Sequence, residues 1–85
     1  MSYTVELKPS AAKALAGSPR RDQERVGAKL DALALEPRPQ GAKVLRGEAG
    51  LLRVRVGDYR VIYTVEDDVL LVLVIRIAHR REAYR

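Results

Sequence analysis

Hydrophobic positions follow two different periods in the two halves of this chain. Tyr3, Val5 and Leu7 alternate with polar residues, which predicts a short strand over residues 3–7. From residue 11 to about residue 35 the apolar residues recur with helical spacing. Beyond residue 51 that spacing is absent, and β-rich runs replace it. The pattern therefore predicts a strand, a helical region and then a sheet.

Two helices are predicted before residue 36. Pro9 or Ser10 opens a short helix over residues 11–16, and Gly17 ends it. Ser18 as N-cap and Pro19 at the first helical position open a second helix, and the tight link makes a helical hairpin. The charged residues on one side of the second helix are interpreted as a solvated face without function. Its apolar stripe consists of Val26, Leu30, Leu33 and Ala34.

Three β-rich runs cover residues 52–56, 59–65 and 69–78, and hairpin signals separate them. They form an antiparallel meander, while the pattern leaves the position of the first strand in the sheet open. The prediction is an α+β fold in which a helical hairpin packs on one face of a small, mostly antiparallel four-stranded sheet, in the order β-α-α-β-β-β.

A two-residue loop at residues 57–58 sets the pairing of the first hairpin. It places Arg55 opposite Arg60 and Arg53 opposite Ile62, so the three arginines share one face. Opposed like charges cost some tenths of a kcal/mol, roughly, so this crowding indicates an anion that binds there. The alternative is that the arginines lie flat and cover apolar sheet with their stems. The opposite face is apolar and is expected to meet the helices; it carries Leu52, Val54, Val56, Tyr59, Val61 and Tyr63.

The last strand is expected to bring further bases to this surface. The end of this strand, residues 78–81, is expected to lie beside the 57–58 turn. Four basic side chains would then gather at one end of the sheet. A three-residue loop at residues 66–68 pairs Val65 with Val69 and puts Arg76 on the arginine face. A two-residue loop would direct Arg76 toward the helices, which is costly for an unpaired charge.

Composition bounds the class of protein. With 85 residues and 9.5 kDa, the chain is expected to be one domain, residues 1–85, and 47% hydrophobic residues suffice for a core. Cysteine is absent and histidine occurs once, which excludes thiol chemistry and argues against a metal site. No apolar signal segment opens the chain, and the apolar run over residues 69–75 is too short to span a bilayer. We therefore expect a soluble cytoplasmic domain with no cofactor, no metal and no membrane partner.

Charge suggests a polyanionic partner. Sixteen basic residues, twelve of them arginine, face eleven acidic ones, for a net charge of +5 and a pI near 10.0. This balance is typical of proteins that bind nucleic acid. Codon bias with a gain in solubility, or an acidic protein partner, would explain the same charge.

The segment Gly57-Asp58-Tyr59-Arg60-Val61-Ile62-Tyr63, the acidic turn at 66–68 and the ending His-Arg-Arg-Glu-Ala-Tyr-Arg at 79–85 resemble the RelE family of bacterial type II toxins, within the RelE/ParE superfamily. Residues 43–47 also resemble the family's segment before the sheet. The resemblance covers essentially the whole chain. It implies a compact, metal-independent ribonuclease that enters the ribosomal A site and cuts mRNA there. It also implies a cognate antitoxin, RelB-like or another, which masks the basic face and through which the pair reaches operator DNA.

The resemblance assigns roles residue by residue. Arginine forks stabilise the charge of a phosphorane, and the near-terminal tyrosine stacks on a base. The residues that match catalytic positions are Arg53, Arg55, Arg60, Arg80 (with Arg81 as the fallback) and Tyr84. The bases predicted to bind RNA are Lys43, Arg46, Arg76, Arg81 and Arg85.

One departure affects the mechanism. The best-known members carry lysines where this chain has Arg53 and Arg55, and arginine does not lose its proton. Two hypotheses follow: His79 acts as base or acid, or the arginines act by orientation and charge alone. The alternative for His79 is a solvated residue at the strand end.

Two rival functions use the same fold or the same charges. A ParE-like toxin would poison DNA gyrase by binding, without a catalytic ensemble. A non-catalytic module would bind nucleic acid or an acidic protein through the arginines, with salt-sensitive affinity and intact RNA. The remaining aromatic and acidic residues receive structural interpretations: Tyr3, Tyr59 and Tyr63 face the core, and the turn at 66–68 is turn chemistry rather than a metal site.

Overall fold

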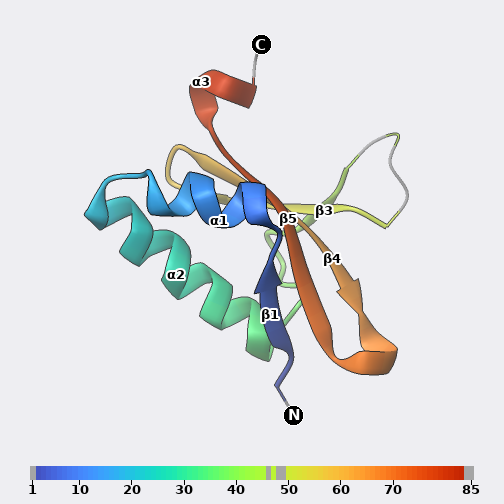
Figure 1. Cartoon of the computed structure of the whole chain (residues 1–85). Helices are drawn as coiled ribbons and strands as arrows, with labels where there is room; N and C mark the ends of the chain where they lie inside the picture. The colour runs from blue at the N-terminus through green and yellow to red at the C-terminus, as the bar shows by residue number, and fades with distance from the viewer. Residues whose placement is uncertain (1, 46, 48–49, 84–85) are drawn as a thin grey trace.

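The first two helices of the chain lie on one face of the sheet and leave the other face uncovered (Figure 1). The structure, a computed structural model, describes residues 2–45, 47 and 50–83. Along the chain it forms β1 (Thr4–Leu7), α1 (Pro9–Ala16), α2 (Arg20–Leu35), β2 (Lys43–Val44), β3 (Leu52–Val56), β4 (Tyr59–Glu66), a 3₁₀ turn (Asp67–Val69), β5 (Leu71–His79) and α3 (Arg80–Ala83). Among the helices of the described residues, none has the length and apolarity that crossing a membrane requires.

The predicted α+β class is confirmed, with one strand more than expected. The sheet has five strands in the order β1-β5-β4-β3-β2. The additional strand is β2, whose two residues pair with Arg53 and Leu52 of β3. A strand of two residues is too short to show an alternating pattern, so it could not be predicted from periodicity. β1 lies parallel to β5, with Thr4 opposite Leu71 and Leu7 opposite Val74.

The predicted register of the β3–β4 hairpin is confirmed. Arg55 lies opposite Arg60, and Arg53 lies opposite Ile62. Gly57, at the first central position of the turn, has a φ of 59°, the conformation that type II′ hairpin turns require there. Because glycine adopts this conformation at little cost, the turn fixes the pairing of every residue behind it.

The predicted three-residue loop between β4 and β5 is wrong. Val65 pairs with Val72 rather than Val69, because a 3₁₀ turn over Asp67–Val69 and the left-handed Leu70, with a φ of 51°, lengthen the connection. With that loop alone, Arg76 would stand opposite Val61 and point at the helices.

A β-bulge returns Arg76 to the uncovered face. Tyr63 pairs with Val74 but Ile62 pairs with Arg76, so Ile75 is an extra residue in β5. One extra residue reverses the alternation of faces beyond it. Arg76 is exposed and shares the face of Ile62 and Arg60, as predicted, although by a different route.

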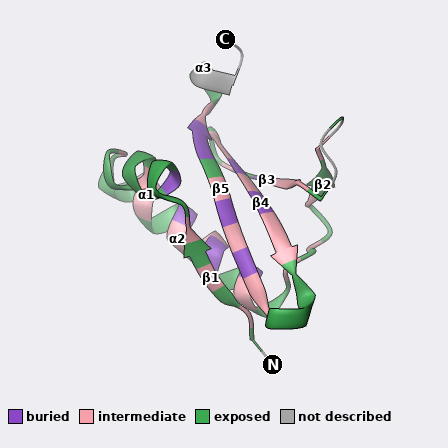
Figure 2. Cartoon of the chain, turned by 45° about the vertical axis from the view of Figure 1, so that its right-hand side comes forward, coloured by how far each residue is buried: buried purple, intermediate pink, exposed green. Residues whose placement is uncertain are grey.

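The core fills the space between the helices and the covered face of the sheet. The α2 stripe is buried at Val26, Leu30 and Leu33, which confirms the helical prediction. Over residues 71–75 of β5 buried residues alternate with partly buried ones, and the alternation ends at the exposed Arg76 (Figure 2). The buried cluster comprises Ala11, Val26, Leu30, Leu33, Val54, Val61, Tyr63, Val72, Val74 and Ile77.

The start of α2 differs from the predicted cap. Pro19 is the N-cap residue and Arg20 the first helical residue, so Ser18 lies one position too early to cap. The Ser18 hydroxyl instead donates to the Leu15 carbonyl at 2.6 Å, at the end of α1. The Gln23 amide of α2 donates to the Ser18 carbonyl at 2.8 Å. These bonds join the two helices across their short link.

Candidate functional site

Basic side chains form two rows across the face of the sheet that the helices leave open. In the first row Lys43 lies opposite Arg53, Arg53 opposite Ile62, and Ile62 opposite Arg76. In the second row Arg55 lies opposite Arg60, which lies opposite Ala78. Neighbouring strands are about 4.8 Å apart, so the positive charges lie close together. We call this surface the basic face; its bases are Lys43, Arg53, Arg55, Arg60 and Arg76.

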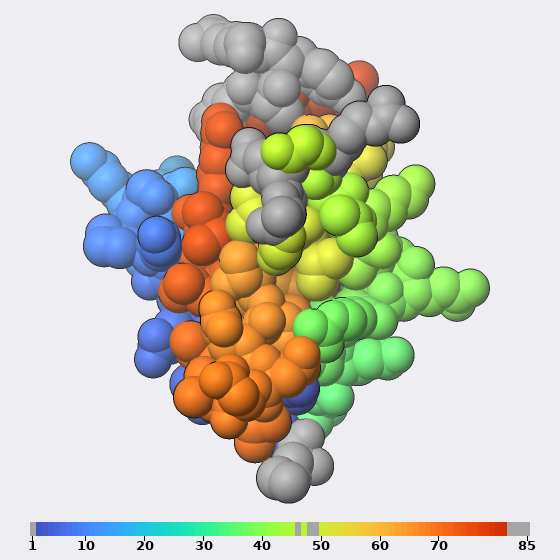
Figure 3. All heavy atoms as spheres, turned by 90° about the vertical axis from the view of Figure 1, so that its right-hand side faces the viewer, coloured from blue at the N-terminus to red at the C-terminus, as the bar shows by residue number. Residues whose placement is uncertain are grey.

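The charges of the basic face have no acidic partner among the described residues. None of its five bases forms an ion pair with another described residue. Arg53 and Arg60 are half-buried, so their stems lie along the sheet while Arg55 and Arg76 are exposed. Figure 3 shows this side of the molecule, with β5 and β4 toward the viewer. Stems that cover the sheet account for the burial, but the uncompensated charge still favours an anionic ligand.

Arg80 is held at the same end of the sheet. Its backbone N–H donates to the Asp58 carbonyl at 2.6 Å, and its guanidinium lies 3.9 Å from the Asp58 carboxylate. Since Asp58 belongs to the β3–β4 turn, Arg80 lies close to the end that carries the Arg55–Arg60 pair. The predicted return of the chain to this turn is confirmed.

Arg25 of α2 reaches the same turn, which sequence reasoning did not foresee. A Cβ built on Gly57 would lie 2.9 Å from Arg25 Nη2, so the guanidinium rests directly against the turn. The helical pattern predicted that Arg25 belongs to a solvated face of α2 without function. No sequence signal identifies this contact, because it depends on how α2 crosses the sheet.

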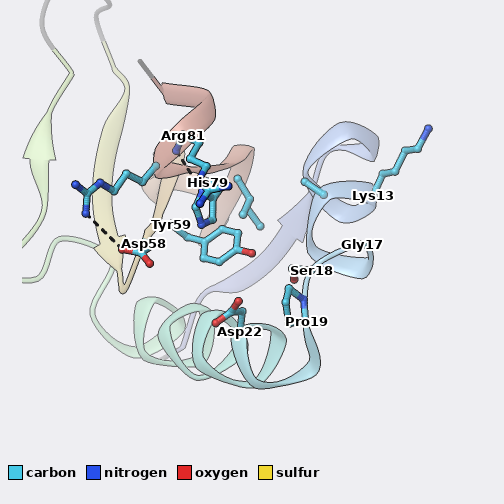
Figure 4. Close-up of a pocket in the computed structure, with 12 residues that line it drawn as sticks. Lys13, Gly17, Ser18, Pro19, Asp22, Asp58, Tyr59, His79 and Arg81 are labelled. Atoms are coloured by element: carbon cyan, nitrogen blue, oxygen red, sulfur yellow. Dashed lines mark hydrogen bonds and ion pairs between the residues drawn. The ribbon is translucent and has the colours of Figure 1, made fainter. Parts of the chain in front are cut away.

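His79 lies on the other face. It pairs with Tyr59, whose side of the sheet is covered by the helices, and the two rings meet edge to face with centroids 5.1 Å apart. His79 Nδ1 accepts the Arg81 backbone N–H at 3.2 Å. Figure 4 shows these rings near Ser18 and Pro19 of the α1–α2 link, across a hollow of about 1140 Å³. The structure therefore separates His79 from the arginines of the basic face.

Three predicted site residues, Arg46, Tyr84 and Arg85, lie outside the described residues. Of the others, the structure gathers Lys43, Arg53, Arg55, Arg60 and Arg76 on one face. Arg81 is exposed and lines the hollow beside His79 instead. The predicted set is thus divided between the two faces, with Arg80 at the turn.

The acidic turn at the far end of β4 has a structural role. Asp67 accepts two hydrogen bonds from Arg38, at 2.8 and 3.0 Å, and one from the Tyr3 hydroxyl at 2.6 Å. The Arg38 guanidinium and then the Tyr3 hydroxyl lower the pKa of Asp67 to about 2. The hydrogen bond to Asp67 in turn raises the pKa of Tyr3. We call Tyr3, Arg38 and Asp67 the Asp67 cluster; no group of three metal-ligating side chains gathers in the described part of the chain.

Tyr63 adds a buried polar contact near this cluster. Its side chain is inaccessible to solvent, and its hydroxyl donates to the Pro37 carbonyl at 2.7 Å. Burial raises the pKa of Tyr63. The bond ties the loop after α2 to the middle of β4, and the prediction that Tyr63 faces the core is confirmed.

Comparison with known proteins gives matches over nearly the whole chain. Residues 5–84 match the family model described as the ParE toxin of the type II toxin–antitoxin system parDE. The toxin RelG of Mycobacterium tuberculosis is 33% identical over 86 residues, which cover 100% of this chain and 99% of RelG.

Solved structures agree with these sequence matches. The archaeal RelE–RelB complex from Pyrococcus horikoshii superimposes with a TM-score of 0.82 at 32% identity, covering 94% of this chain and 97% of that one. The toxin–antitoxin complex RelBE2 from Mycobacterium tuberculosis gives 0.80 at 31% identity, covering 94% and 100%. The match to the ParE toxin model, over residues 5–84, includes the strands that carry the basic face.

Proposed function

Since this chain belongs to the RelE family of type II toxins, within the RelE/ParE superfamily, we propose that it is an endoribonuclease that cuts mRNA in the ribosomal A site and requires no metal ion. The observation that carries the proposal is the basic face. Two opposed arginines, with further bases in the adjacent row, have no acidic partner among the described residues. Such an arrangement costs stability and is explained by a polyanion that binds there.

The reaction begins with attack of the ribose 2′-OH on the neighbouring phosphorus. The P–O5′ bond breaks, and the products are a 2′,3′-cyclic phosphate, or its hydrolysed form, and a 5′-OH. Negative charge accumulates on the phosphorane oxygens in between. Arg55 and Arg60, directly opposite each other, offer two guanidinium forks to these oxygens, and Arg53 lies in the next row.

The described residues of the basic face include no evident group that could transfer the proton. Arginine does not act as a base, because its pKa lies above about 12. His79 lies on the helix-covered side, with Nδ1 accepting the Arg81 N–H. The geometry therefore favours the hypothesis that the arginines act by charge and orientation. In this proposal Tyr84 stacks on a base to align the attack.

The proposed partner is a cognate antitoxin of the RelB type. The P. horikoshii structure is of a RelE–RelB complex, and the M. tuberculosis structure is of a toxin–antitoxin complex. We propose that an antitoxin masks the basic face of this chain in the cytoplasm. Operator DNA would be bound through the complex alone.

The decisive experiment adds purified protein to a translating extract and maps the 5′ ends of the message. New ends that carry a 5′-OH, formed on translated message and not on free RNA, are expected. Arg60→Lys keeps the charge but not the fork and serves as the matched variant, with reduced cleavage. Intact message at complete inhibition of translation would contradict the proposal, and salt-sensitive RNA binding without cleavage would support the non-catalytic module.

A second candidate function is inhibition of DNA gyrase. The observation that favours it is the match of residues 5–84 to the ParE toxin model. In this case the protein would block supercoiling by purified gyrase and leave mRNA intact in the extract. The two assays run on the same preparation separate the candidates.

A further inference from the structure

The free edge of β3 forms one wall of a hollow that differs from the one beside His79. β2 pairs only with Leu52 and Arg53, so within the described part of the chain β3 continues beyond it without a neighbouring strand on that side. Helix α2 lies on the covered side of the sheet, and its residue Lys29 lines the hollow. The hollow has a volume of about 450 Å³ and is lined by Lys29, Gly41, Lys43, Arg53, Val54 and Arg55.

Among the described residues, every ionisable side chain that lines this hollow is basic. Lys29, Lys43, Arg53 and Arg55 come from three different elements, and none forms an ion pair with another described residue. The hollow beside His79, by contrast, includes the carboxylates of Asp22 and Asp58 in its lining. Four positive charges around a concave site concentrate the electrostatic potential and attract an anion.

The backbone adds a donor to the same place. In a hairpin with a two-residue loop, the residues that close the loop, here Val56 and Tyr59, exchange both hydrogen bonds. The bonding direction alternates along the strand, so the N–H of Arg55 points away from β4, toward the free edge. Cationic side chains together with a backbone N–H are a usual set of phosphate ligands.

We propose that this hollow binds a phosphodiester of single-stranded RNA and that Lys29 is an RNA-binding residue. The choice of RNA as the ligand rests on the proposed function. Lys43, Arg53 and Arg55 belong both to the basic face and to the hollow, so the two form one positively charged track around the edge of β3. RNA on the basic face then continues toward α2, where Lys29 meets a phosphate next along the chain.

The test measures binding of a short, fluorescein-labelled 2′-O-methyl RNA, which cannot be cleaved by 2′-OH attack, as a function of salt. Each phosphate contact contributes about 0.7 to the slope of log K against log salt for single strands. Lys29→Gln is expected to lower the slope by about that amount, and Lys29→Arg is expected to retain it. The matched control is Lys8→Gln, which removes one exposed lysine charge beside β1, at the opposite edge of the sheet, and is expected to leave the slope unchanged.

Other outcomes overturn the proposal. A Lys29→Gln slope equal to that of the wild type refutes the contact, and an equal loss in Lys8→Gln shows that only net charge matters. Weaker antitoxin binding with unchanged RNA binding assigns the hollow to the antitoxin. Thermal unfolding of the Lys29 variants checks that both are folded.

The nuclease proposal fails separately. If the wild-type protein cuts no message in the extract but its RNA binding depends on Lys29, the nuclease proposal is refuted and the RNA-binding role of the hollow is supported. Message cleavage by the wild type, together with an unchanged salt slope in Lys29→Gln, supports the nuclease and refutes the contact between Lys29 and RNA.

Discussion

At the end of the sheet where β4 turns toward β5, Asp67 accepts hydrogen bonds from both Arg38 and Tyr3, and its charge is compensated. On the open face of the same sheet, Arg55 and Arg60 stand opposite each other, and neither forms an ion pair among the described residues. Both regions are accessible to solvent and include arginine. What separates them is the presence of an acid.

Because only one of the two regions has, among the described residues, an acidic partner for its arginine, the two regions have different roles. The Arg38–Asp67 ion pair joins the loop after α2 to the β4–β5 turn, and the hydrogen bond from the Tyr3 hydroxyl to Asp67 adds the residue before β1. Like charges on the basic face oppose folding by some tenths of a kcal/mol per opposed pair, roughly. Residues that reduce stability and remain exposed are typical of binding sites. Substitutions in the two regions should therefore affect different properties.

The largest expected effect is on cleavage, in Arg60→Gln. Removal of one group that stabilises transition-state charge lowers the rate about 100-fold or more. Because the repulsion from Arg55 is relieved, the urea midpoint of unfolding should stay constant or rise slightly. The measurement pairs message cleavage in a translating extract with urea unfolding. Unaltered cleavage would remove Arg60 from the proposed mechanism.

The next effect is on stability, in Tyr63→Phe. The substitution deletes the donor to the Pro37 carbonyl, and loss of such a bond costs about 1 kcal/mol in the free energy of unfolding. Urea unfolding monitored by circular dichroism gives this value. Tyr3→Phe is the comparison, with a smaller loss because its hydrogen bond is exposed. Cleavage should be normal in both, and reduced cleavage would show that the two regions are coupled.

Arg38→Gln is the counterpart of Arg60→Gln and should behave in the opposite way. It removes the bidentate partner of Asp67, so the urea midpoint at neutral pH should fall by a small amount. Message cleavage should not change, because Arg38 lies outside the basic face. If Arg38→Gln reduced cleavage as strongly as Arg60→Gln, the division into a stabilising and a ligand-binding region would be wrong.

The smallest effect is a dependence of stability on pH. The pKa of Asp67 is about 2 in the folded chain and 3.8 ordinarily, so the carboxylate stabilises the fold above about pH 4. This contribution is lost as the pH falls from about 4 to about 2, when the folded protein takes up the proton. Urea midpoints measured across this interval should decline more steeply for the wild type than for Asp67→Asn. Parallel curves would mean that the Asp67 cluster does not stabilise the fold.

The predictions from sequence succeeded where a short-range rule sets the geometry. Two residues at the Gly57-Asp58 turn fix the opposition of Arg55 and Arg60, because side-chain direction alternates strictly behind a known turn. Helical periodicity likewise identified the buried stripe of α2. Local patterns were sufficient in both cases.

The predictions from sequence failed where a loop or strand contains more residues than a regular hairpin. The turn after β4 is longer than predicted, and the bulge at Ile75 then restores Arg76 to the predicted face. Two shifts of this kind cancel for Arg76, so its correct placement does not validate the predicted loop. His79 lies beyond the bulge, pairs with Tyr59 and faces the helices.

The sequence by itself determined the α+β class, the β3–β4 register and the row of arginines, because these follow from periodicity and one tight turn. Only the tertiary structure decided that β1 joins β5 in parallel, that Arg25 rests against Gly57, and that Lys29 and Lys43 line one hollow at the edge of β3. These contacts join segments far apart in the chain. They depend on how helices and strands pack against one another, and a local pattern of residues does not specify which distant segments come into contact.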